Sequence, residues 1–197
     1  MKKQQTLQLV QLAILLALTI VLQTVGNNFK IGPVSISLVL IPIVLGGILH
    51  GPLAGGLLGL VFGLITLGEP MAQTLLPLSP IMTVVICVGK GTLAGMGSGF
   101  FYRLVAIKNK KGALFAAAAA APVINTLFFI AGCTVIADTV IASGTFGAIP
   151  ADTPWWMFFL MVAAGVSINF IAELIVNLLA APALHRVIET IEKRLKK

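Results

Sequence analysis

Apolar stretches long enough to cross a bilayer occupy most of this sequence. Of its 197 residues, 58% are hydrophobic and only 10% are charged, and the mean hydropathy is +1.07. A bilayer core about 30 Å thick requires roughly 20 apolar residues for each helical crossing. The composition therefore excludes a soluble globular domain and predicts a polytopic membrane protein of the all-α class.

Turn residues divide the chain into six expected transmembrane helices, which form one compact bundle and a single integral membrane domain over residues 1–197. The second span is short for a full crossing and is interrupted by Pro42. The prolines between residues 69 and 80 predict a structured loop that can hold a short surface helix. The expected spans are 6–25, 34–49, 53–68, 81–105, 113–141 and 155–182, followed by a basic amphipathic tail at 183–197.

The basic residues indicate the orientation of this bundle. The net charge is +7, and nearly all of it flanks the spans on the side where both termini lie, whereas the opposite side carries only Lys30. Cytoplasmic loops of membrane proteins are enriched in Lys and Arg. We therefore expect both termini in the cytoplasm, outward-facing loops after spans one, three and five, and no binding of nucleic acid.

Lys90 lies well inside the apolar stretch from Ile81 to Arg103. An ammonium group at membrane depth costs several kcal/mol unless it has a partner, a water-filled cavity or a ligand. Nine residues at about 1.5 Å each put Lys90 roughly 13 Å below the outer surface, a depth that suits the floor of an outward-facing pocket. One interpretation is an ion pair with Glu173 or Asp138, and the other is a hydrogen-bond donor to a bound ligand.

Asn125, Asn169 and Glu173 are the other polar residues inside spans that could converge with Lys90. Asn169 and Glu173 are one helical turn apart and share a face, as a ligand site or an interhelical hydrogen-bond network requires. For Glu173, in the inner half of its span, we favour helix packing or a coupling contact. For the two asparagines, ligand binding and packing remain equally open.

Glycines recur at four-residue spacing in two of the expected spans. A helix face without side chains lets a neighbouring backbone approach closely, so the pattern predicts helix packing. The stretch from Gly89 to Thr92 departs from the Walker pattern, because Gly91 stands where Ser or Thr must follow the Lys, and it predicts no ATPase site. The two series are Gly51, Gly55, Gly59 and Gly63, and Gly91, Gly95 and Gly99.

The sequence contains no recognisable catalytic or metal-binding set. The histidines, His50 and His185, lie at expected cytoplasmic ends, and neither an HExxH motif nor a Ser/His/Asp arrangement is present. Cys87 and Cys133 lie in apolar spans and read as small buried hydrophobic residues. We therefore expect no enzyme activity, no metal and no cofactor.

Two motifs carry a resemblance to a known family. The sequence Gly-Gly-Ile-Leu-His-Gly-Pro-Leu-Ala-Gly at residues 46–55 and the AxxxA pattern from Ala13 to Ala17 resemble those of the substrate-binding S components of energy-coupling factor (ECF) vitamin transporters. The resemblance extends over nearly the whole chain, including its expected six spans and cytoplasmic termini. It is closest to the broad riboflavin, folate and pantothenate branch.

The resemblance implies a function in the plasma membrane of a bacterial-type cell. An S component captures a vitamin or related micronutrient in an outward-facing pocket, docks on a transmembrane coupling subunit driven by two ATPase subunits, and topples to release the ligand inside. Docking would involve Ala13 and Ala17, and membrane lipid would surround the chain. The alternative is a self-sufficient small carrier or a structural bundle with no ATPase partner. The expected substrate-binding residues are Lys90, Asn125 and Asn169, together with Asn28, Lys30 and Gln73 in the lid loops.

Overall fold

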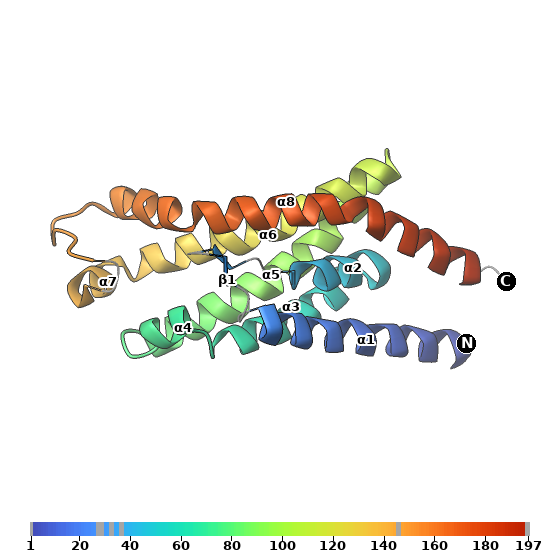
Figure 1. The fold of residues 1–197 in the computed structure, drawn as a ribbon, viewed down its shortest axis with the longest axis horizontal. Coiled ribbons are helices and arrows are strands. Elements are labelled where there is room, and N and C mark those ends of the chain that lie inside the picture. Colours follow the sequence, from blue (N-terminus) through green and yellow to red (C-terminus); the bar gives the residue numbers. More distant parts are fainter. Residues whose placement is uncertain (1, 27–29, 32–33, 36–37, 145–146, 196–197) are drawn as a thin grey trace.

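The computed structural model is a bundle of helices that run mostly along one common direction (Figure 1). It describes residues 2–26, 30–31, 34–35, 38–144 and 147–195. Within these ranges the only strands are β1 (Lys30–Ile31) and β2 (Val34–Ser35), which form one antiparallel pair. The helices are α1 (Lys2–Gly26), α2 (Leu40–His50), α3 (Pro52–Thr66), α4 (Pro70–Leu75), α5 (Pro80–Ala106), α6 (Lys110–Val135), α7 (Ala137–Ser143) and α8 (Trp155–Leu195).

Four of the described helices, α1, α5, α6 and α8, are long and apolar enough to cross a membrane. With 11 and 15 residues, α2 and α3 extend only about 17 and 23 Å at 1.5 Å per residue, less than a bilayer core. A tight turn at Gly51, whose φ is 96°, joins these two shorter helices. The prediction of a helical membrane bundle is confirmed, whereas six complete crossings remain a prediction.

Three helix boundaries differ from the expected spans. Pro42 does not interrupt the second helix but lies in its first turn, where the missing N–H has no helical partner to lose. The expected span at 113–141 is two helices, because the backbone of Ile136 leaves the helical conformation (φ −105°, ψ 23°). The expected tail is not separate, since α8 continues through Pro182 to Leu195.

The glycine series of α3 and α5 face each other with their backbones in contact. A Cβ atom added at Gly55 would overlap the carbonyl oxygen of Gly95, and one added at Gly59 would overlap that of Gly91. One turn further on, a Cβ at Gly63 would lie 2.6 Å from the carbonyl oxygen of Cys87. The prediction of helix packing is therefore confirmed for both series except Gly51, which lies in the turn before α3 with a φ of 96°.

The two ends of the bundle differ in charge. The start of α1, the turn between α5 and α6, and the end of α8 lie at one end, whereas α4, α7 and the start of α8 lie at the other (Figure 1). Lysines and arginines flank the spans at the first end. Among them are Lys2, Lys3, Arg103, Lys108, Lys110, Lys111 and Arg186.

Replacing Gly59 with Ala is expected to lower the melting temperature of the purified protein in detergent, with a loss of about 1–3 kcal/mol. The added methyl group would force the α3 and α5 backbones apart. Gly165→Ala in α8 is the matched control, because an added Cβ there meets nothing within 4 Å. Equal melting temperatures for the two variants would contradict backbone contact between α3 and α5.

Candidate functional site

Lys90 lies in the middle of α5, with its ammonium group over two aromatic rings. α5 begins at Pro80, so ten residues at 1.5 Å place Lys90 about 15 Å along the helix. Its Nζ atom is 5.7 Å from the centroid of the Phe62 ring of α3 and 5.6 Å from that of Phe129 of α6. Aromatic faces attract cations, most strongly where water is scarce. The two rings therefore stabilise a charge that would be costly at this depth.

Two polar residues on other helices lie near this ammonium group. Asn125 is one turn before Phe129 on α6, and its side chain is 8% exposed. Its amide lies within hydrogen-bonding reach of the Glu173 carboxylate on α8, and Lys90 interacts electrostatically with the same carboxylate. Side chains of α5, α6 and α8 thus form a polar cluster, which we define as Lys90, Asn125 and Glu173.

An ion pair does not explain the position of Lys90. In the part of the chain that the structure describes, no salt bridge joins Lys90 to Glu173 or Asp138. Asp138 is exposed on α7. Of the two interpretations of Lys90, the ion pair is therefore not supported. The ammonium group is held by ring faces, which leave its hydrogen-bond donors available.

The side-chain oxygen of Asn125 is buried and accepts no hydrogen bond from the described part of the chain. Among the described residues, the buried side-chain polar atoms that lack a hydrogen-bond partner are His50 Nε2 and Asn125 Oδ1. Most other buried polar side chains are satisfied within their own helices, as in the 2.9 Å bond from Asn177 Nδ2 to the Glu173 carbonyl oxygen. A buried polar atom without a partner costs about 1–3 kcal/mol, so a bound group that donates to Asn125 would be stabilised here.

An apolar cavity of about 350 Å³ lies towards the less basic end of the bundle. Its walls come from α4, from the segment before α8, and from the first three turns of α8. The volume falls within the range typical of small-molecule pockets. The lining residues are Met71, Ile149, Phe158, Met161, Val162, Gly165 and Val166.

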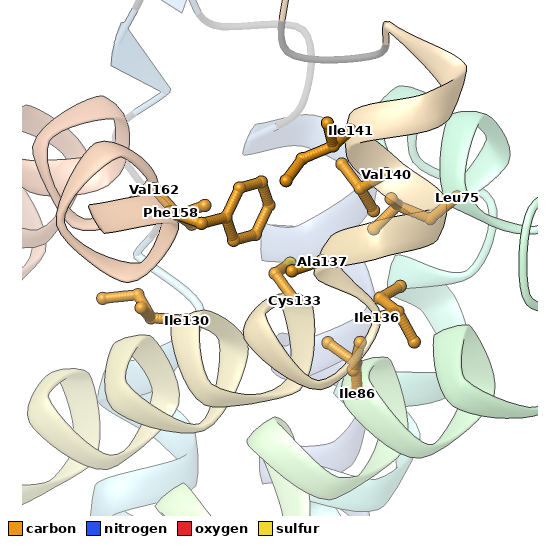
Figure 2. Packing of buried hydrophobic residues seen from close by; sticks show 10 residues of the cluster. All are labelled: Leu75, Ile86, Ile130, Cys133, Ile136, Ala137, Val140, Ile141, Phe158 and Val162. Atoms are coloured by element: carbon orange, nitrogen blue, oxygen red, sulfur yellow. The ribbon is translucent and has the colours of Figure 1, made fainter. Parts of the chain in front are cut away.

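A packed apolar cluster supports this cavity. Figure 2 shows side chains of α6, α7 and α8 meeting Leu75 of α4 and Ile86 of α5. Phe158 and Val162 belong both to this cluster and to the cavity wall. Phe129, which contacts the Lys90 ammonium group, also packs against the cluster. The cavity and the polar cluster are therefore connected through shared packing.

One face of α8 runs from the cavity to the polar cluster. Val162 and Val166 line the cavity, and Asn169 and Glu173 follow at intervals of three and four residues. Residues at these intervals share a face of an α-helix. Asn169, which is half-buried, thus lies between the cavity and Glu173, although its side chain has no hydrogen bond within the described part of the chain.

The expected lid residues do not join the polar cluster. Gln73 is exposed on α4. Its Nε2 donates to the Leu67 carbonyl oxygen at 2.7 Å, which ties α4 to the end of α3. Asn28 and the side chain of Lys30 lie outside the described residues, although the Lys30 backbone pairs with Ser35. The structure thus brings Lys90 and Asn125 together with Glu173.

The first helix presents a small-residue patch on its outer face. Leu15 and Thr19 are buried against the bundle, whereas Ala13 and Ala17 are exposed. Large apolar side chains surround the two alanines on this face, including Ile14 and Leu18. In a membrane protein such a face contacts lipid or another helix, and alanines allow a close approach.

Sequence reasoning missed the aromatic rings that hold Lys90. The sequence did contain a signal for Phe129, because it follows Asn125 by one helical turn and therefore shares a helix face with it. No comparable signal existed for Phe62, because only the packing of α3 on α5 brings it to Lys90. Reasoning also missed the hydrogen bond from Gln23 Nε2 on α1 to the Glu69 carboxylate before α4, which joins two distant segments.

The fold and the site define a polytopic helical membrane protein with a ligand-sized cavity and buried polar groups beyond it. The sequence model of the family "ECF transporter, substrate-specific component" matches residues 7–185. The chain therefore belongs to this family, whose members are membrane subunits that bind transported substrates and are not enzymes. No curated protein matches the chain significantly.

The contact between Lys90 and Phe129 can be measured by a double-mutant cycle. Lys90→Met and Phe129→Leu are expected to couple by about 1 kcal/mol in thermal unfolding, because each substitution removes the same cation–π contact. Phe128→Leu is the matched control, since Phe128 lies against Gly89 and its coupling to Lys90→Met should be near zero. Equal coupling for both phenylalanines would contradict a specific ring contact.

Proposed function

We propose that this protein is the substrate-binding subunit of an ATP-driven ECF importer, and that it captures a vitamin or related micronutrient in an outward-facing pocket. Membership of the substrate-specific component family supports the general role. The observation that carries the finer proposal is the convergence of Lys90, Asn125 and Glu173 beyond the apolar cavity. A ligand in the cavity would direct its polar end towards this cluster.

The chemistry of the cluster limits the ligand. The Lys90 ammonium group would donate to a carboxylate or to the carbonyl of a polar heteroaromatic ring, and charge-assisted hydrogen bonds of this kind are among the strongest. The open acceptor of Asn125 would take an N–H or O–H donor. The apolar lining would suit a ring or alkyl portion. This combination favours a ligand of the riboflavin, folate or pantothenate type.

The lid residues belong to the same proposal. Gln73 belongs to α4, the helix that contributes Met71 to the cavity wall, and we assign it a contact with the ligand from this lid. Asn28 and Lys30 precede α2 in the loop after the first helix, and we assign them the same role. Asn169 would contact the ligand between the cavity and the polar cluster.

The charge distribution supports a plasma membrane orientation with both termini in the cytoplasm. The basic residues cluster at the end of the bundle where α1 begins and α8 ends (Figure 1). Positive charge is retained on the cytoplasmic side during insertion. In this orientation the cavity opens outward, as uptake of an external nutrient requires.

Transport would require partner subunits. The sequence around Lys90 departs from the Walker pattern, so we assign ATP hydrolysis to two separate ATPase subunits. A transmembrane coupling subunit would dock on the exposed face of α1 at Ala13 and Ala17. Toppling of the loaded bundle against this subunit would carry the cavity from the outer side to the inner side.

The first test identifies the ligand and then removes Lys90. Mass spectrometry of small molecules that copurify with the protein supplies the ligand, and calorimetric titration measures its affinity. Lys90→Ala is expected to weaken binding about 10- to 100-fold, the equivalent of one hydrogen bond to a charged group. Lys108→Ala, at the exposed turn between α5 and α6, is the control and should bind normally. Unchanged affinity in folded Lys90→Ala protein would refute the assigned site.

The second test concerns docking. Ala13→Trp is expected to abolish uptake of the labelled ligand by cells that contain the coupling module, because the indole would block close helix approach. Ligand binding by the purified variant should be unchanged. Ala131→Trp, at an exposed position of α6, is the control and should transport normally. Normal uptake by Ala13→Trp, or loss of uptake by both variants, would argue against docking on α1.

A further inference from the structure

A groove of about 310 Å³ lies between the start of α6 and the last third of α8, far from the candidate substrate site. One part of its wall is basic or ionisable and the other part is apolar, and none of the described residues that line it is acidic. Its residues are Lys111, Leu114, Phe115, Ala181, Pro182, His185 and Arg186.

The groove lies near the ends of two helices that are long and apolar enough to cross a membrane. In the sequence, basic residues precede the apolar run of α6 up to Lys111, and charged residues follow that of α8 from Arg186 onward. Lys111 and Arg186 therefore stand at the level of lipid headgroups, where cationic side chains are favoured. The exposed Phe115, about one turn inward, would stand beside the acyl chains, and the buried Leu114 continues the apolar wall. The wall thus changes from cationic to apolar in the direction in which a lipid changes from headgroup to chain.

The local structure keeps this wall in place. Leu114 and Leu184 belong to a buried cluster that holds α6 against α8. Asn109 Oδ1 accepts the backbone N–H groups of Lys111 and Gly112 at 3.0 and 3.1 Å, which fixes the first turn of α6. Because Asn109 already occupies these N–H groups, an anion in the groove would be bound by side chains. Lys111 and Arg186 are exposed, and Phe115 is 46% exposed, so the groove is open to the bilayer.

We propose that this groove binds the phosphate headgroup of an anionic phospholipid, with Lys111 and Arg186 contacting the phosphate and Phe115 contacting the first acyl methylenes. Basic pockets between transmembrane helices are suited to anionic headgroups by charge complementarity. The guanidinium group of Arg186 can bind two phosphate oxygens at once. A bound lipid would link the start of α6 to the end of α8. The inference does not depend on the proposed vitamin transport.

The test measures lipid binding by the purified full-length chain in native mass spectrometry, with phosphatidylglycerol and phosphatidylcholine as probes. The wild-type protein is expected to prefer phosphatidylglycerol. Lys111→Gln combined with Arg186→Gln should lower its affinity for phosphatidylglycerol at least about tenfold, since both charged contacts are lost. Lys108→Gln combined with Lys110→Gln is the matched control, because it removes the same net charge from the same end outside the groove, and it should stay within about twofold of wild type.

Further measurements separate the proposal from its alternatives. Lys111 and Arg186 are both exposed, so the double variant at these positions should fold. If it does not fold, Arg186→Gln alone provides a second test. Equal binding of the two lipids, or equal losses in both double variants, would overturn the proposal. Displacement of phosphatidylglycerol by millimolar inorganic phosphate would identify a site for soluble anions instead. If the Lys111→Gln and Arg186→Gln double variant binds phosphatidylglycerol normally but no longer copurifies with the coupling subunit, the groove is a protein contact and the lipid proposal is overturned.

Discussion

Backbone contact between α3 and α5 is the constraint on which the candidate site depends. The facing glycines at Gly59 and Gly91 leave no room for side chains, so the two helices approach as closely as their backbones permit. This approach brings the ring of Phe62 to the ammonium group of Lys90. A wider separation would leave the ammonium group in an apolar interior without one of its two ring contacts.

The arrangement of the polar cluster reflects the free-energy cost of burying polar groups at membrane depth. Lys90 is stabilised by ring faces rather than by a salt bridge, and this arrangement leaves its N–H donors free for another partner. The open acceptor of Asn125 and the carboxylate of Glu173 lie close by. Buried polar networks are costly when partly satisfied, which is the physical basis for proposing that a polar ligand binds here.

Much of the fold was predictable because a bilayer imposes strong rules on sequence. Hydropathy identified the four long helices, and four-residue glycine spacing identified the packed faces. Boundaries failed where local geometry decided them. The helix α6 ends at Val135 within a run of residues that is largely apolar, so hydropathy gave no sign of the break at Ile136. Conversely, α8 continues through Pro182 although proline usually ends a helix. Of the predicted substrate residues, Lys90 and Asn125 converge, whereas Gln73 bonds within its own loop.

By itself, the sequence determined that this chain is a helical membrane protein, which of its helix faces pack closely, and that Lys90 requires a stabilising environment. These properties follow from residue type and periodicity, which the bilayer and helix geometry convert directly into structure. Only the tertiary structure decided what surrounds Lys90, because Phe62, Phe129 and Glu173 belong to three helices remote from it in sequence. Contacts of this kind depend on how helices are placed beside one another, and no local pattern records that placement.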